Sequence, residues 1–170
     1  MTTADTLVRM TEVDYDPFAA PQVVRSFPTT DAQREIWLAA ELGPEASLAY
    51  NESISLQMKG RLDVGTLQVA LQELADRHEA LRATFDADGA NMVIASQINL
   101  TAKLIDLSGM APGDREESLA RLRAEAVETP FDLLNGPLIR AVLVRTAADS
   151  NELILTAHHI VCDGWSFGII

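Results

Sequence analysis

The chain has 170 residues, of which 48% are hydrophobic, so it is long and apolar enough to bury the core of one domain. Its formal net charge of −12 at pH 7 argues against a nucleic-acid partner, which would need a basic face. No apolar run is long enough to span a membrane and the acidic N-terminal stretch is unlike a signal peptide, so we expect a cytoplasmic protein without a membrane partner.

The N-terminal segment, residues 1–26, shows no periodicity and is predicted to be a leader or linker. A helix is predicted to begin after Thr30, where Gln33 three positions later completes a capping box. Gly43-Pro44 is predicted to end this helix, and Trp37 is expected to pack inward from it.

Residues 52–59 alternate between apolar and polar side chains, with Ile54, Leu56 and Met58 on one face, which predicts a half-buried strand. Asp63 is then expected to cap a second helix. The apolar stripe of that helix recurs at steps of three and four residues, and its histidine is expected to be a packed, structural one. The stripe consists of Leu67, Ala70, Leu71, Leu74, His78 and Leu81.

The middle of the chain continues with a predicted turn at residues 86–89, a strand at 91–98 and a short extended piece at 104–106. A further helix is predicted from residue 112 until Pro130 ends it. Its buried face would carry Leu119, Leu122 and Ala126.

Two apolar stretches near the C-terminus, 138–145 and 152–158, are predicted to form an antiparallel hairpin through the polar residues 147–151. A last helix is expected to begin at residues 165–170. This alternation of strands and helices predicts an α/β sandwich with a mixed β-sheet and packed helices.

Two adjacent histidines follow directly on the last predicted strand. If the two-residue period of the strand persists, His158 projects with Ile154 and Thr156, whereas His159 projects with Leu155 on the other side. One imidazole can then be locked into the fold while the other opens into a cleft, and the pattern does not decide which. Histidine is the side chain best suited to move a proton near neutral pH, so this is a plausible position for an active site.

The residues after the histidines allow several functions. Gly164 can let the chain turn sharply and expose its amide to a ligand, and Asp163 can accept a buried hydrogen bond or pair with an arginine. An isolated pair such as His158 and His159 can equally be a satisfied core element. A metal site is not expected, because adjacent histidines diverge on a strand and no further ligand cluster is present. Cys162, the single cysteine, is expected to fill space rather than act as a nucleophile.

Four segments resemble motifs of the condensation domains of non-ribosomal peptide synthetases. Residues 158–164 are similar to the HHxxxDG signature, 77–85 to the RHExLRxxF segment and 130–141 to the PFDLxxGPLxRA segment. Residues 30–37 resemble the opening SxAQxRxW segment, except that Glu35 stands where arginine is common. The four motifs also occur in the family's order.

The resemblance covers residues 27–170 and implies the N-terminal lobe of a chloramphenicol-acetyltransferase-like fold. Condensation domains have a second, C-terminal lobe, and their histidine loop lies at the floor of a tunnel between the two lobes. The resemblance therefore implies that this chain is a fragment without the C-terminal lobe and is inactive alone.

The reaction implied by the resemblance is amide formation between a donor acyl or peptidyl thioester and an acceptor aminoacyl thioester. Donor and acceptor carrier proteins would present both on covalent 4′-phosphopantetheine arms, so the lobe itself would bind no cofactor and no metal. His159 would accept the amine proton or hold the amine, and the backbone N–H near Gly164 would stabilise the oxyanion.

The remaining motif residues are implied to support the site. His158 and Asp163 would hold the histidine loop, and Arg77 or Arg82 would brace Asp163. The residues alone also permit each arginine to be simply solvated.

Other functions stay open. The lobe could dock a carrier protein without catalysis, or the domain could acylate a free alcohol or amine as other members of the superfamily do. A heterocyclising domain would be expected to carry aspartate in place of His158 and His159, whereas an epimerising domain is less easily separated. Residues 13–18 resemble a linker to an upstream module, as in a hybrid polyketide/peptide synthetase, and could equally form a disordered tail.

Overall fold

The computed structural model describes residues 25–170, so the expectations for the leader before Arg25 lie outside the described residues. A four-stranded mixed sheet, in the order β2-β7-β6-β5, forms its centre. β5 runs parallel to β6, and the other pairs are antiparallel. The sheet confirms the predicted hairpin and the mixed α/β fold class. Its strands are β2 (Asn51–Lys59), β5 (Ala102–Asp106), β6 (Ile139–Ala147) and β7 (Ser150–His158).

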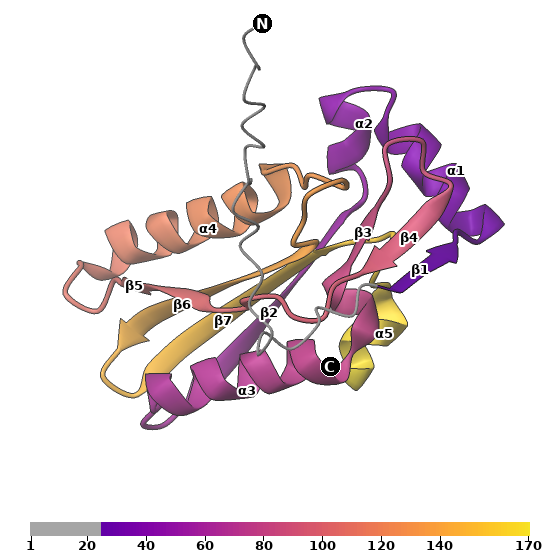
Figure 1. Ribbon diagram of the computed structural model, residues 1–170. Helices are drawn as coiled ribbons and strands as arrows, with labels where there is room; N and C mark the ends of the chain where they lie inside the picture. The colour runs from indigo at the N-terminus through magenta and orange to yellow at the C-terminus, as the bar shows by residue number, and fades with distance from the viewer. Residues whose placement is uncertain (1–24) are drawn as a thin grey trace, which may run out of the picture.

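Two helices, α3 (Val64–Arg77) and α4 (Pro112–Glu128), cover opposite faces of this sheet (Figure 1). Successive side chains of β7 point to opposite faces of the sheet, which explains why it has a helical layer on each face. Leu155 points to the α3 side and packs in one apolar cluster with Leu71, while Ile154 points to the α4 side and packs with Leu119. β7 is therefore buried on both faces, which agrees with its nearly continuous apolar sequence.

A second, three-stranded sheet lies beside the first and carries α1 (Asp31–Ala40). Its order is β1-β4-β3, with β1 (Arg25–Pro28), β3 (Ala83–Phe85) and β4 (Asn91–Ile94). A third apolar cluster joins α1 and this sheet to the loop that follows β7. A 3₁₀ turn, η1 (Glu79–Arg82), links α3 to β3, and α5 (Gly164–Ile169) follows the histidine loop as expected.

Several boundaries differ from the predicted ones. α1 ends at Ala40, and Pro44 then opens a separate short helix, α2 (Pro44–Leu48), because the fixed φ of proline suits the first helical position. The strand predicted at 91–98 ends at Ile94. β1 was not predicted, since a four-residue strand that pairs with the distant β4 leaves no local period to detect.

The apolar stripe predicted for the second helix is also shorter than expected. α3 ends at Arg77, and His78 leaves the helix with φ −106° and ψ 102°. Ala70 is exposed, and Ala75 occupies the fully buried position instead. The helix thus stops before Leu81, which is buried from η1.

Candidate active site

His158 is the histidine that is locked into the fold. Its side chain is fully buried, with the Phe131 ring edge-on at a centroid distance of 6.2 Å and the Tyr50 ring at 5.9 Å. Its Nδ1 accepts the backbone N–H of Ile160 at 3.3 Å. Burial, together with the nearby His159, lowers the pKa of His158 to about 4. His158 is therefore a neutral, structural imidazole at physiological pH.

His159 projects to the opposite side, as the strand period predicts for adjacent residues. Its backbone N–H donates to the carbonyl oxygen of Tyr50 at 2.8 Å, and its ring lies nearly parallel to the Tyr50 ring at 6.5 Å. The side chain is 37% exposed, and its Nδ1 lies 2.5 Å from Oε1 of Glu52 on β2. The Glu52 oxygen lies off the direction of a linear hydrogen bond, so the two atoms are in close electrostatic contact without a hydrogen bond.

The sequence reasoning missed Glu52, although a signal for it was present. Glu52 begins the alternating face of β2 that also carries Ile54, and it is paired in register with Ala157. A carboxylate on the same strand face as apolar side chains, beside the strand that ends one residue before His159, is an unusual placement. Only the β2–β7 register, which is a long-range property, shows where this carboxylate lies.

Asp163 and Gly164 form the start of α5. The Asp163 carboxylate caps the helix by accepting the N–H of Ser166 at 2.8 Å and its hydroxyl at 2.6 Å, and these bonds lower the pKa of Asp163. Asp163 is exposed, so the buried hydrogen bond considered for it is not formed. Gly164 is the first residue of α5, where a helical N–H has no partner one turn earlier, and the space beside its Cα is open.

The structure does not join the two arginines to Asp163. Arg82 is buried and donates to the carbonyl oxygens of Ala75 (2.7 Å), Asp76 (2.6 Å) and Ala95 (3.0 Å), which ties the end of α3 to the residue after β4. Arg77 is exposed at the end of α3. Within residues 25–170 neither arginine forms an ion pair with Asp163, because the free carbonyls at the helix end occupy Arg82 instead.

The other motif segments converge on the histidine loop. Phe131 of the Pro-Phe-Asp-Leu segment packs edge-on against His158, and Gln33 of the opening segment donates to the carbonyl oxygen of Ile160 at 3.5 Å. Ile160 also belongs to the apolar cluster that contains Phe85 and Phe131. Segments far apart in sequence thus hold the loop, with His158 as its buried anchor.

Cys162 lies in the same loop and is 2% exposed. Its burial raises the pKa of the thiol to about 11, with the negative charges of Glu52 and Asp163 adding to the effect. The thiol is therefore protonated and unsuited to nucleophilic attack. Among the described residues no group of three or more His, Cys, Asp and Glu side chains is placed to hold a metal ion.

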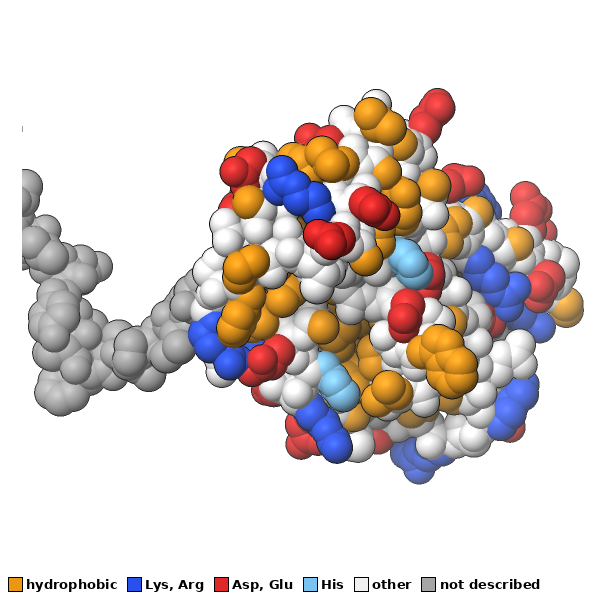
Figure 2. Space-filling model, turned by 90° about the vertical axis from the view of Figure 1, so that its right-hand side faces the viewer, with side chains coloured by type: hydrophobic (Ala, Val, Ile, Leu, Met, Phe, Trp, Pro, Cys, Tyr) orange, Lys and Arg blue, Asp and Glu red, His pale blue; other side chains and the backbone are white. Residues whose placement is uncertain are grey.

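Figure 2 shows the side of the molecule on which α1 and α5 lie, where histidine side chains reach the surface among hydrophobic and acidic ones.

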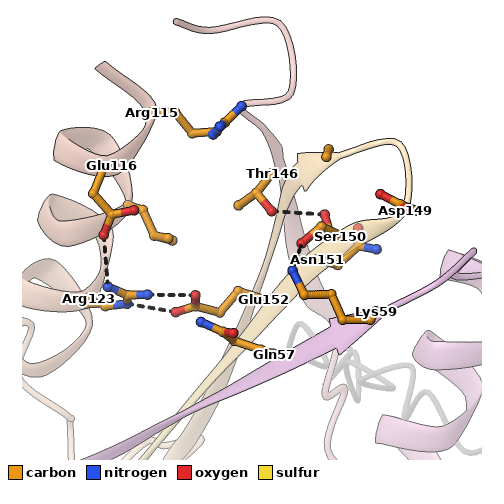
Figure 3. A pocket seen from close by; sticks show the side chains of 12 residues that line it. Gln57, Lys59, Arg115, Glu116, Arg123, Thr146, Asp149, Ser150, Asn151 and Glu152 are labelled. Carbon is orange, nitrogen blue, oxygen red and sulfur yellow. Dashed lines mark hydrogen bonds and ion pairs between the residues drawn. The ribbon is translucent and has the colours of Figure 1, made fainter. Parts of the chain in front are cut away.

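A separate pocket of about 430 Å³ lies between α4 and the β6–β7 hairpin and contains none of the predicted site residues (Figure 3). There Arg123 holds the buried Glu152 carboxylate through bonds of 2.8 and 2.7 Å. No described helix has the length and apolarity needed to cross a membrane.

Comparisons with known proteins agree on one family. Residues 23–170 match the model of the condensation domain family. The chain is 41% identical over 144 residues to a linear gramicidin synthase of Brevibacillus parabrevis, and 40% identical over 144 residues to chondramide synthase cmdD of Chondromyces crocatus. Each alignment covers 84% of this chain but only 3% and 4% of those relatives, respectively.

A solved structure, the starter condensation domain of rhizomide synthetase RzmA, superposes on the chain with a TM-score of 0.75 at 26% sequence identity. The match covers 85% of this chain and 35% of that structure. The match of the family model, the identity to the synthetases and the shared fold lead to one assignment. The chain belongs to the condensation domain family of peptide synthetases.

Proposed function

We propose that this chain forms the N-terminal part of a domain that makes amide bonds in non-ribosomal peptide synthesis. The donor would be an acyl or peptidyl thioester and the acceptor an aminoacyl thioester, each on the 4′-phosphopantetheine arm of a carrier protein domain. The observation that carries the proposal is the placement of His159, a half-exposed imidazole anchored by its backbone beside the buried His158. The sequence relatives are peptide synthetases, which supports this chemistry over acylation of a free alcohol.

The proposed step joins the acceptor nitrogen to the donor carbonyl carbon and breaks the donor carbon–sulfur bond. Holding both thioesters together makes the encounter effectively intramolecular, which lowers its entropic cost. His159, as a neutral imidazole, accepts the proton that the amine loses on becoming an amide, and that proton can then pass to the departing thiolate. The N–H of Gly164, at the first position of α5, would donate to the developing oxyanion.

His158 and Asp163 act in this proposal as structural supports. His158 fills the core beneath the loop, and Asp163 fixes the first turn of α5 and thereby the backbone of Gly164. Arg82 supports the site indirectly, by holding the end of α3. Because the chain spans about a third of the RzmA structure, we propose that a second lobe supplies the rest of the tunnel and of the carrier-docking surfaces.

The test uses the complete native domain that contains these residues, together with donor-loaded and acceptor-loaded carrier proteins. The mass of the acceptor carrier is followed for the parent and for His159→Ala. We expect product from the parent and a fall of about 10²- to 10⁴-fold in the variant, the range typical of a lost general base. His78→Ala is the matched control, because His78 is a partly exposed histidine outside the loop.

Transfer by the parent with no loss in His159→Ala would remove His159 from the mechanism. No transfer by a folded parent across several donor and acceptor pairs, with carrier binding retained, would favour a non-catalytic docking lobe.

A further inference from the structure

We propose that Glu52 is a positioning residue that keeps the proton of the neutral His159 imidazole on Nδ1 and leaves the Nε2 lone pair free for the acceptor amine. The proposal rests on the function proposed above for His159. It assigns to the site a side chain that lies outside the four motif segments.

The strand register explains why the two side chains meet. Glu52 of β2 is paired with Ala157 of β7, and the bond from the His159 N–H to the Tyr50 carbonyl continues this antiparallel ladder by one further pair. Glu52 and His159 are therefore diagonal neighbours on the same face of the sheet, a spacing that long side chains can bridge. The ring of Tyr50 lies nearly parallel to the imidazole.

The short distance favours one position for the imidazole proton. An ionised carboxylate only accepts hydrogen bonds, and an imidazole nitrogen without a proton does the same. At 2.5 Å, the negative charge on Oε1 of Glu52 repels an unprotonated Nδ1 of His159 and attracts an Nδ1 that carries a proton, even without a linear hydrogen bond. The contact therefore favours the neutral ring that has its proton on Nδ1, and in that ring Nε2 is the free acceptor.

His158 provides an internal contrast. Its Nδ1 accepts a backbone N–H, so its single proton lies on Nε2. The two adjacent histidines thus hold opposite tautomers, each set by the group that faces Nδ1. Only the tautomer of His159 leaves a ring nitrogen that can receive a proton from a ligand while the protonated nitrogen faces a carboxylate.

The surroundings of Glu52 argue against a purely structural role for this carboxylate. Its side chain is 33% exposed, and among the described residues its one close polar contact is His159. A glutamate kept only for solubility would point away from the apolar face that it shares with Ile54.

The first measurement is the tautomer of His159, read from the ¹⁵N shifts of its ring nitrogens in protein labelled at histidine. The His159 signals are identified by their loss in His159→Gln. We expect Nδ1–H in the parent and a shift toward Nε2–H in Glu52→Ala, because a free neutral imidazole favours that form. Glu52→Gln, which retains an acceptor oxygen, should keep much of the parent tautomer. Glu117→Ala, on the exposed side of α4, removes the same charge and should change nothing.

The second measurement is amide formation in the complete domain, where Glu52→Ala should slow the reaction about 10- to 100-fold, the range known for loss of a carboxylate that orients a metal-binding histidine. Glu52→Gln should recover part of this loss. An Nε2–H tautomer in the parent, or an unchanged tautomer in Glu52→Ala, would overturn the proposal. A tautomer change with full transfer by His159→Ala would instead uphold the placement of Glu52 and reject the catalytic role of His159.

Discussion

Replacing Arg123 by methionine is expected to leave a buried, unpaired carboxylate in the strand that carries the histidines. Glu152 lies on β7 and is 2% exposed, and Arg123 of α4 holds it through the two bonds of 2.8 and 2.7 Å. Methionine keeps most of the apolar stem of arginine but removes both donors. The substitution therefore isolates the charge interaction from the packing of α4 on the sheet.

The expected loss follows from the burial of the pair. Removing one partner of a fully buried ion pair costs about 3–5 kcal/mol. The Arg123 side chain is 37% exposed, so solvent already screens part of the interaction. We therefore expect a loss of about 2–3 kcal/mol, which lowers the Tm of a chain of this size by about 4–12 °C.

The pH dependence provides a sharper test. The bonds from Arg123 lower the pKa of Glu152 in the folded protein, against the opposing effect of burial. A carboxyl group with a lowered folded-state pKa contributes stability above its unfolded-state pKa, and that contribution is lost as the pH falls through the folded-state value. In Arg123→Met the unpaired carboxyl can escape its penalty by protonation. The difference in stability between parent and variant should therefore be largest at pH 7 and shrink toward pH 4.

Urea unfolding at pH 7 and at pH 4 measures this difference, with Arg115→Met as the control, because Arg115 lines the same pocket and makes no described ion pair. Glu152→Gln combined with Arg123→Met should recover part of the loss, since a neutral amide is cheaper to bury than an unpaired charge. A loss below about 0.5 kcal/mol at pH 7, the range of ordinary surface substitutions, or one equal at both pH values, would refute the reasoning.

Two further predictions concern the frame of the site. Gly89→Ala should lower stability by about 2–4 kcal/mol in thermal or urea unfolding, because a left-handed backbone penalises a Cβ and the new atom would overlap the ring of Trp37. The φ of Gly89 is +65°, and a Cβ added there would lie 2.3 Å from the nearest atom of the Trp37 ring. Gly109→Ala is the control and should be tolerated, because the space beside Gly109 is open. Asp163→Ala should lower the Tm because α5 loses its cap, and Asp163→Asn, which keeps a capping oxygen, should lower it much less. In the double variant the Tm losses of Asp163→Ala and Arg82→Met should add, because the two residues are not in contact. A non-additive loss would indicate the pairing of Arg82 with Asp163 that the structure does not show.

Local signals predicted much of the fold. The capping box at Thr30 and Gln33 is formed as expected, and Asp63 caps α3. The opposite orientation of His158 and His159 follows from the period of β7 alone. These features depend on neighbouring residues, so a pattern in the sequence is enough to find them.

Features that depend on long-range pairing could not be predicted in this way. The contact between Glu52 and His159 needs the register of β2 on β7, and the partners of Arg82 depend on where α3 ends. The sequence pattern extended that helix through Leu81, whereas His78 is in fact its C-cap. The last carbonyl groups of a helix have no partner within the helix, and Arg82 donates to those of Ala75 and Asp76. It therefore does not form the predicted pair with Asp163.

The most direct test of the central claim is a single-turnover measurement with saturating donor and acceptor carriers, which separates chemistry from docking. We predict that His159→Ala, in the complete domain, slows amide formation by at least about 10²-fold while the Kd for each carrier stays within a factor of about three. An unchanged single-turnover rate, or a loss found wholly in carrier binding, would contradict the account and leave the histidine loop a structural element.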